Sequence, residues 1–355
     1  MASSPKILLI SLLFLIFFIS ETLGQSENAT RTKCTSSYGN GCHNKTEAFK
    51  LKLIAIASIL VTSMIGVTLP ILSRAVPALQ PDKDLFVIVK AFASGVILAT
   101  GYMHVMPDSF DCLRSECLPK NPWRKFPFAT FVAMLSAIVT LMVDSFALSY
   151  YKKRCCGGGT VESGKQVMDG HVESQSFGHC HGNGFDGLVD VEASQLLRHR
   201  VIAQVLELGI IVHSVVIGLS MGASENPCTI RPLIAALCFH QLFEGMGLGG
   251  CILQAAYGIK TTAIMVFFFS STTPFGIALG IGLSNVYSDN SPKALIVVGI
   301  LSASSAGLLN YMALVDLLAS DFMGFKLQKS MKLQIWAYCA VLLGAGFMSL
   351  MAKWA

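Results

Sequence analysis

Apolar and polar residues alternate along the chain in long blocks. From residue 51 onward, apolar runs of about twenty residues are separated by short polar turns. An α-helix rises ~1.5 Å per residue, so a run of this length crosses the ~30 Å apolar core of a bilayer. We therefore expect an all-α, polytopic membrane protein with eight transmembrane helices, near residues 51–73, 86–107, 127–150, 199–222, 232–255, 261–285, 294–317 and 332–352.

The first 24 residues do not fit this pattern. Their apolar run, from Ile7 to Ile19, is shorter than the roughly twenty residues that a span requires, and small and polar residues follow it. These features predict a signal peptide over residues 1–24 that is cleaved from the mature chain. An uncleaved first helix is the alternative.

Residues 25–50 are polar and contain two sequons, at Asn28 and Asn44, which predict N-glycosylation and an extracytoplasmic location. Cys34 and Cys42 in the same segment are candidates for a disulfide in an oxidising compartment. Because eight spans return the chain to the side on which it started, both mature termini are expected outside the cytosol.

Composition and charge agree with a membrane protein. Hydrophobic residues make up 53% of the chain and charged residues 13%, and the mean hydropathy is +0.61, which excludes a soluble globular protein. The net charge of +5 is small and spread over many loops, so it does not indicate a nucleic-acid partner. Lys and Arg divide almost equally between the two predicted sides, so the orientation rests on the signal peptide and the sequons.

These patterns divide the chain into five parts. They are the signal peptide, the extracytoplasmic segment, the first three spans with their loops, a cytoplasmic loop and the last five spans, at residues 1–24, 25–50, 51–150, 151–198 and 199–355. The loop after the second span holds Cys112 and Cys117, which could pair with each other or with the N-terminal cysteines.

The cytoplasmic loop is rich in glycine and lacks the periodicity of a helix or strand. It contains His171 and the run His179, Cys180 and His181. Imidazole and thiolate are both ligands of Zn²⁺, so this loop is a candidate for weak metal binding. A solvated loop with incidental histidines is the alternative.

Several polar residues interrupt the predicted spans. His104 and Asp108 lie four residues apart near the outer end of the second span, and Asp111 follows one turn later. Such an acidic mouth would attract cations, although acids at a helix end can also simply contact water. Near the inner ends, Asp144 could line an exit or form a hydrogen bond between helices, and for Asp316 the second role is favoured.

The fourth and fifth spans bring two imidazoles to one depth. His213 and His240 are equally far from the centre of their connecting loop, so an antiparallel pair places them ~13 Å below the outer surface, near the bilayer midplane. Glu244 lies one turn below His240 on the same face. These nitrogen and oxygen ligands suit Zn²⁺, Fe²⁺, Mn²⁺ or Co²⁺, which predicts a metal site.

Further side chains and the helix packing fit this site. His104 can supply a third imidazole, whereas Ser214 and Gln241 can bind weakly or orient water. Gly276 and Gly280 form a small face in the sixth span that would let another helix approach closely.

Three motifs together resemble the ZIP (zinc- and iron-regulated transporter-like) family of metal transporters, most closely its plant iron/zinc branch. They are His104-Val105-Met106-Pro107-Asp108-Ser109-Phe110, His213-Ser214-Val215-Val216-Ile217-Gly218 and His240-Gln241-Leu242-Phe243-Glu244-Gly245. The resemblance implies eight helices, both ends outside, and uptake of divalent metal into the cytosol. It also implies a transport site at His213, His240 and Glu244, with His104 lining the same cavity.

The chain shows one departure from this family pattern that bears on the number of metal ions. Several members form a two-metal site with an acidic residue four after the fourth-span histidine and an acid or amide beside the fifth-span motif. Ile217 and Gln241 occupy these positions here. We therefore expect one principal transport site.

The resulting hypothesis is alternating access at a mid-membrane His/Glu site that carries Zn²⁺ and Fe²⁺, with Mn²⁺ or Cd²⁺ as further cargo. The chain would be no enzyme and would hold no resident cofactor, because the transported ion binds transiently. The expected partners are divalent cations and the lipid bilayer. The plasma membrane is the simplest location, and the sequence leaves open whether the protein forms a homodimer. An intramembrane zinc hydrolase is the rival, but Glu207 is poorly placed to act as its base.

Overall fold

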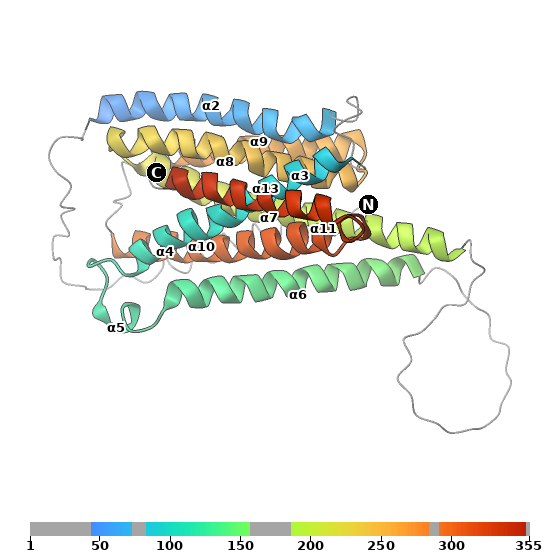
Figure 1. Ribbon diagram of the computed structural model, residues 1–355. Helices are drawn as coiled ribbons and strands as arrows, with labels where there is room; N and C mark the ends of the chain where they lie inside the picture. The colour runs from blue at the N-terminus through green and yellow to red at the C-terminus, as the bar shows by residue number, and fades with distance from the viewer. Residues whose placement is uncertain (1–43, 73–82, 157–185, 284–290, 353–355) are drawn as a thin grey trace, which may run out of the picture.

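The computed structural model describes residues 44–72, 83–156, 186–283 and 291–352, and these residues form α-helices, π-helical segments and turns. Eight helical stretches of the described chain are long and apolar enough to cross a membrane. This confirms the expected all-α, polytopic architecture (Figure 1).

Two of the eight spans are built from more than one element. The spans are α2 (Lys45–Leu72), α3–η3–α4 (Asp84–Ala99, Thr100–Val105, Met106–Leu113), α6 (Phe128–Cys156), α7 (Asp186–Ala223), α8 (Pro227–Gln254), α9 (Ile259–Leu283), α10–η4–α11 (Pro292–Tyr311, Met312–Ala319, Ser320–Phe322) and α13 (Met331–Ala352). Short helices α5 (Lys120–Trp123) and α12 (Phe325–Gln328) lie in the connections.

Several helices start where the sequence supplies a capping residue. The Asn226 side chain accepts a hydrogen bond from the Cys228 amide, and Pro227 occupies the first position of α8. Ser291 caps α10 in the same way through the Ala294 amide, again just before a proline. These side chains satisfy amide donors that a helix start leaves unpaired, which fixes the short loop between α7 and α8.

The fourth span begins earlier than hydrophobicity alone indicates. α7 starts at Asp186, so the end of the predicted loop 151–198 is helical, and α6 likewise continues to Cys156. Polar residues continue a helix beyond the bilayer because its backbone hydrogen bonds are internal. Apolar length therefore marks the membrane segment and not the ends of the helix.

The spans associate in two groups (Figure 1). The α8 group contains α2, α7, α8 and α9, and the α3 group contains α3–η3–α4, α6, α10–η4–α11 and α13. Helices α7 and α8 are the most buried, with 72% of the residues of their apolar segments inside the protein. Most side chains in these two segments are therefore shielded from lipid.

Within the α8 group, glycines allow α7 and α9 to touch. A methyl group added to Gly280 would lie 2.8 Å from the Gly222 Cα atom, and one added to Gly276 would lie 3.2 Å from the Gly218 Cα atom. Side chains at these positions would force the helices apart. The predicted small face of the sixth span is thus a helix contact.

Two spans contain a π-helical stretch, which widens one turn of the helix and changes the direction of its side chains. In the second span η3 carries His104, and in the seventh span η4 carries Asp316. Both stretches belong to the α3 group, and both place a titratable side chain in the protein interior.

Candidate metal site

Three potential metal ligands meet at the centre of the protein. His213 on α7 and His240 and Glu244 on α8 each offer one donor atom, and these atoms all lie within 4.8 Å of one another. Donors on opposite sides of one ion lie about 4.2 Å apart, twice a bond of about 2.1 Å. The three side chains are therefore close to the arrangement of a single-ion site, and a small contraction would complete it.

The packing of α7 against α8 produces this arrangement. The two helices run antiparallel from a short loop, and the His213 and His240 rings lie 5.6 Å apart between centroids. Glu244 follows His240 by one helical turn and so faces the same side of α8. The equal depth expected from the sequence is therefore present in the structure.

His104 approaches this set from the α3 group. Its ring centroid lies 6.1 Å from that of His240, and its side chain is 6% exposed. It is not among the three residues whose donors lie within 4.8 Å of one another. The site therefore spans the boundary between the two helix groups, with three ligands on one side and His104 on the other.

Unpaired polar atoms concentrate at this site. Eight of the twelve buried side-chain atoms that have no hydrogen-bond partner among the described residues belong to it. They are His104 Nε2, His213 Nε2, both ring nitrogens of His240, both carboxylate oxygens of Glu244, Ser214 Oγ and Gln241 Nε2. Each such atom costs about 1–3 kcal/mol in a folded protein, so a cluster of them indicates a site for a ligand that coordinates these atoms.

Ser214 and Gln241 adjoin these residues in sequence, and both are buried. Thr273 on α9 donates a hydrogen bond at 3.5 Å to the Gln241 side-chain oxygen. That contact turns the Gln241 oxygen toward α9. The weaker roles of Ser214 and Gln241 therefore stay predictions.

A cavity of about 230 Å³ leads to the site from the end of the bundle that holds α4 and the loop between α7 and α8. Asp108 and Asp111 line it together with His104 and His213. Two carboxylates at the wide part of a cavity produce a negative potential, which concentrates cations there. The structure thus brings the predicted acidic mouth and two of the predicted ligands, His104 and His213, to the lining of one cavity.

The opposite end of the bundle carries the other intramembrane acids. Asp144 on α6 accepts a hydrogen bond of 3.2 Å from the Tyr311 hydroxyl. Asp316 is 2% exposed, and its Oδ2 atom has no partner in the described part of the chain. The helix-to-helix hydrogen bond expected for Asp316 therefore occurs at Asp144 instead.

Disulfides occur at the same end as the cavity. Cys117 and Cys228 are each disulfide-bonded, whereas Cys112 is free. The pairing of Cys112 with Cys117 that the sequence allowed is therefore wrong. Cys112 instead lines the cavity beside Asp111.

Some predicted residues cannot be placed. The signal peptide, Asn28, Cys34 and Cys42 lie outside the described residues, as do the loop ligands His171, His179, Cys180 and His181. Asn44 is described: it is exposed, and its side chain accepts a hydrogen bond from the Glu47 amide at the start of α2.

Sequence reasoning overlooked Lys90, which it counted only among the positive charges of the inner side. In the structure Lys90 is 4% exposed and lies within the second span. A lysine directly after five apolar residues, Leu85 to Val89, was the available signal, since charged side chains inside a span are usually functional.

The fold and the site together define a class: a multi-pass membrane protein with a buried cluster of potential His and Glu metal ligands beside an acidic cavity. Residues 49–352 match the family described as "ZIP Zinc transporter". The chain therefore belongs to the ZIP family, as its three motifs suggested.

Individual relatives support this assignment. The chain is 64% identical over 327 residues to "Fe(2+) transport protein 1" of Oryza sativa subsp. japonica, covering 88% of this chain and 86% of the relative. It is 56% identical over 357 residues to "Zinc transporter 7" of Arabidopsis thaliana, covering 99% and 98%. It is 54% identical over 355 residues to "Fe(2+) transport protein 1" of Arabidopsis thaliana, covering all of both chains.

Proposed function

We propose that this protein transports divalent metal ions, Zn²⁺ and Fe²⁺ above all, through the membrane and into the cytosol. The observation that carries the proposal is the trio His213, His240 and Glu244, three buried ligands with their donor atoms within 4.8 Å of one another. His104 completes the set from the α3 group. Imidazole and carboxylate accept both metals, and also Mn²⁺ and Cd²⁺.

The names of the relatives favour more than one metal. Proteins named for Fe²⁺ transport and proteins named as zinc transporters share similar identity with this chain, 54–64% and 56% respectively. Identity therefore does not separate the two cargoes. A mixed nitrogen and oxygen site gives no strong preference either, because Zn²⁺ and Fe²⁺ differ little in the ligands they accept.

The position of the oxidised cysteines supports the orientation that uptake into the cytosol requires. Cys117 and Cys228 are oxidised, which is typical of an extracytoplasmic compartment, and they lie at the end where the cavity opens. The cavity then faces outward, and both ends of the eight-span bundle lie outside the cytosol. The plasma membrane is the simplest location for a protein that takes up metal from such a side.

Below the site, packed apolar side chains close the path toward the cytosol. Ile97, Leu206, Leu248 and Ile252 are at most 2% exposed and belong to one core cluster. An ion held at the midplane can leave inward only if this cluster opens while the outer cavity closes. We therefore infer transport by alternating access, because a site that was open to both sides at once would let ions leak through the membrane.

A single transport site is the form of the proposal that fits this chain. Ile217 packs with Ala55, Ile59 and Met221 in an apolar cluster, and so offers no ligand. Gln241 directs its oxygen to Thr273. Ile217 thus supplies no acid for a second ion, and the oxygen of Gln241 is engaged by Thr273.

The rival function, an intramembrane zinc hydrolase, loses its support with the family assignment, because the family and its relatives are named as transporters. Radiometal uptake by the purified protein in liposomes tests the proposal. We expect the wild type to accumulate ⁶⁵Zn²⁺ and ⁵⁵Fe²⁺, and His213→Ala and Glu244→Ala to lose nearly all uptake. Cys339→Ala is the control, since it changes an exposed side chain on α13 away from the site.

Uptake by His213→Ala and Glu244→Ala at the wild-type rate would refute the assigned site. No uptake by a folded wild-type protein would refute the function. Gel filtration of the same preparation with light scattering shows whether the transporter is a homodimer.

A further inference from the structure

Lys90 presents an energetic problem that the metal site does not explain. Its ammonium group lies inside the second span, and its side chain is 4% exposed. Burying a charge is costly unless it is paired and hydrogen-bonded, and in a membrane span such a residue usually has a function. The partners of Lys90 therefore indicate what it does.

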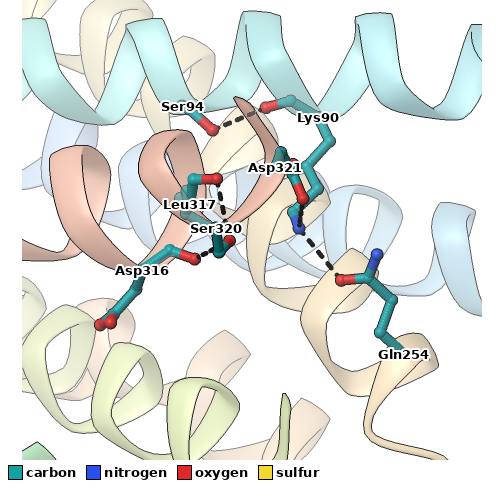
Figure 2. A network of polar contacts seen from close by, with 7 residues as sticks. All are labelled: Lys90, Ser94, Gln254, Asp316, Leu317, Ser320 and Asp321. Carbon is teal, nitrogen blue, oxygen red and sulfur yellow. Dashed lines mark hydrogen bonds and ion pairs between the residues drawn. The ribbon is translucent and has the colours of Figure 1, made fainter. Parts of the chain in front are cut away.

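Two side chains satisfy the ammonium group (Figure 2). The Lys90 Nζ atom lies 2.9 Å from Asp321 Oδ1, in an ion pair, and donates a hydrogen bond of 3.0 Å to the Gln254 Oε1 atom. The Ser94 hydroxyl also donates a hydrogen bond of 2.8 Å to the Lys90 backbone carbonyl. We call Lys90, Asp321 and Gln254 the lysine network.

The lysine network joins the two helix groups. Lys90 lies on α3 and Asp321 on α11, so the ion pair is internal to the α3 group. Gln254 is the last residue of α8, the helix that carries His240 and Glu244. The hydrogen bond between Lys90 and Gln254 therefore crosses the boundary between the groups and ties the end of the ligand-bearing helix to the α3 group.

The network lies on the far side of the metal site from the cavity. Gln254 follows Glu244 by ten residues, or ~15 Å of helix, and Lys90 precedes His104 by fourteen, or ~21 Å. The cavity lining contains Asp108 and Asp111, which lie beyond His104 in the other direction. The lysine network thus holds the two groups together at the end that is closed while the cavity is open.

We propose that the lysine network is an inner latch, with Lys90 as a positioning residue that keeps the site closed to the cytosol until α8 moves. This inference rests on the proposed transport function. The latch releases when the hydrogen bond between Lys90 and Gln254 breaks and α8 separates from α3 at this end, which opens a path from Glu244 inward.

The two contacts of the ammonium group differ in a way that suits a latch. The ion pair with Asp321 stays within one helix group, so it persists when the groups separate, and the charge is never left unpaired in the membrane. The contact that must break is a hydrogen bond to a neutral amide, which is weaker than one to a carboxylate. A latch of this design closes firmly enough to seal the site and still opens in each transport cycle.

Two substitutions at Gln254 test the latch in opposite directions. Gln254→Leu removes the contact across the boundary and leaves the ion pair intact. Gln254→Glu replaces the amide with a carboxylate, which strengthens the contact with the ammonium group. A residue that matters only for folding would not give effects of opposite sign.

Cys251 provides a native reporter for the test. It lies on α8 one turn before Gln254 and is 2% exposed, so an alkylating reagent reaches it only when the inner end opens. We expect N-ethylmaleimide to label Cys251 at least threefold faster in Gln254→Leu than in the wild type. In Gln254→Glu we expect slower labelling and a severalfold lower maximal rate of Zn²⁺ uptake, with KM changed less than twofold. Labelling is measured by mass spectrometry of the full-length protein in liposomes.

Gln328→Leu is the control, because it removes an exposed glutamine from the same end of the protein outside the network. Labelling of Cys251 that is equal in Gln254→Leu, Gln254→Glu and Gln328→Leu would overturn the latch, as would a change of the same sign in both Gln254 variants. These results leave the proposed function standing as long as the wild type transports metal. Failure of the wild type to transport metal would instead refute the function itself.

Discussion

The metal site and the lysine network are both buried polar clusters inside a membrane protein, yet they differ in whether their polar atoms have hydrogen-bond partners. At the metal site, both Glu244 oxygens and both His240 nitrogens have no hydrogen-bond partner among the described residues. In the lysine network, the Lys90 ammonium group has two partners at 2.9 and 3.0 Å. Burial is nearly complete in both places, so burial alone does not distinguish them.

The difference shows how to tell a binding site from a structural contact in such a protein. Buried polar atoms that lack partners raise the free energy of the folded state, and a fold retains them where a ligand uses them. Buried polar atoms that satisfy each other hold elements together. The first cluster is therefore assigned to the cation and the second to the relative position of the helices.

The largest expected effect is at Glu244. Glu244→Gln keeps the shape of the side chain but removes the negative charge that compensates the cation. We expect the initial rate of ⁶⁵Zn²⁺ uptake to fall by about 100-fold or more. Loss of a group that only supports a metal ligand already lowers metal affinity or activity by about 10–100-fold. The thermal stability of the metal-free protein should not decrease, because the carboxylate has no partner to lose. A large loss of stability without metal would instead make Glu244 a structural residue.

The second largest effect is expected at Lys90, and it is of the opposite kind. Lys90→Met leaves the Asp321 carboxylate without its cation, and breaking a buried pair costs about 3–5 kcal/mol. Because the Asp321 side chain is 20% exposed, we expect a loss of about 2 kcal/mol in a chemical unfolding experiment. The Kd for Zn²⁺ should stay within twofold of the wild type.

A double variant sharpens this result. Lys90→Met with Asp321→Leu removes both charges, so it should recover most of the stability that Lys90→Met loses. Equal losses in the single and double variants would show that the ion pair is not what stabilises this end of the protein.

The sequence predicted one of the two clusters and overlooked the other. The equal distance of His213 and His240 from their loop predicted their meeting, because helices of known rise joined by a short turn leave little freedom. The eight spans followed from apolar length alone. Lys90 was overlooked because its partners, Gln254 and Asp321, are 164 and 231 residues away along the chain, and no local pattern contains such pairings.

The π-helical stretches were also beyond sequence reasoning. η3 is more polar than α3, whereas η4 is almost wholly apolar, so composition gives no common signal for the two stretches. His104 was expected to line the site from its position in a motif. The structure adds that it comes from the other helix group, which a one-dimensional pattern does not reveal.

The third effect, at His104, tests whether the site needs a ligand from both groups. His104→Ala should raise the KM for Zn²⁺ uptake by about tenfold, because one imidazole of the set is lost while the three closest donors remain. His213→Ala should have a larger effect, since it removes a member of that trio. Equal effects of the two substitutions would mean that His104 binds the ion as closely as His213.

The fourth effect concerns pH. Imidazole nitrogens bind metal only when they are unprotonated, so protons and metal compete for them. We expect the KM for Zn²⁺ to rise severalfold only at strongly acid pH, in liposomes with a fixed inner pH. The dependence should be shallower in His104→Ala, which has one competing imidazole fewer, and unchanged in Lys90→Arg, which alters only the lysine network.

The smallest effect, at Ser214, separates the two kinds of cluster most directly. The Ser214 side chain is fully buried, and its hydroxyl has no partner in the part of the chain that the structure describes. Ser214→Ala should lower uptake by only about twofold, because the hydroxyl is at most a weak ligand. The same change removes an unsatisfied buried group, so the metal-free protein should become about 1 kcal/mol more stable. Thermal unfolding without metal and ⁶⁵Zn²⁺ uptake measure the two quantities in one preparation. A variant that lost both stability and uptake would show that the Ser214 hydroxyl holds the helices together, and the distinction between the metal site and the lysine network would then fail at this residue.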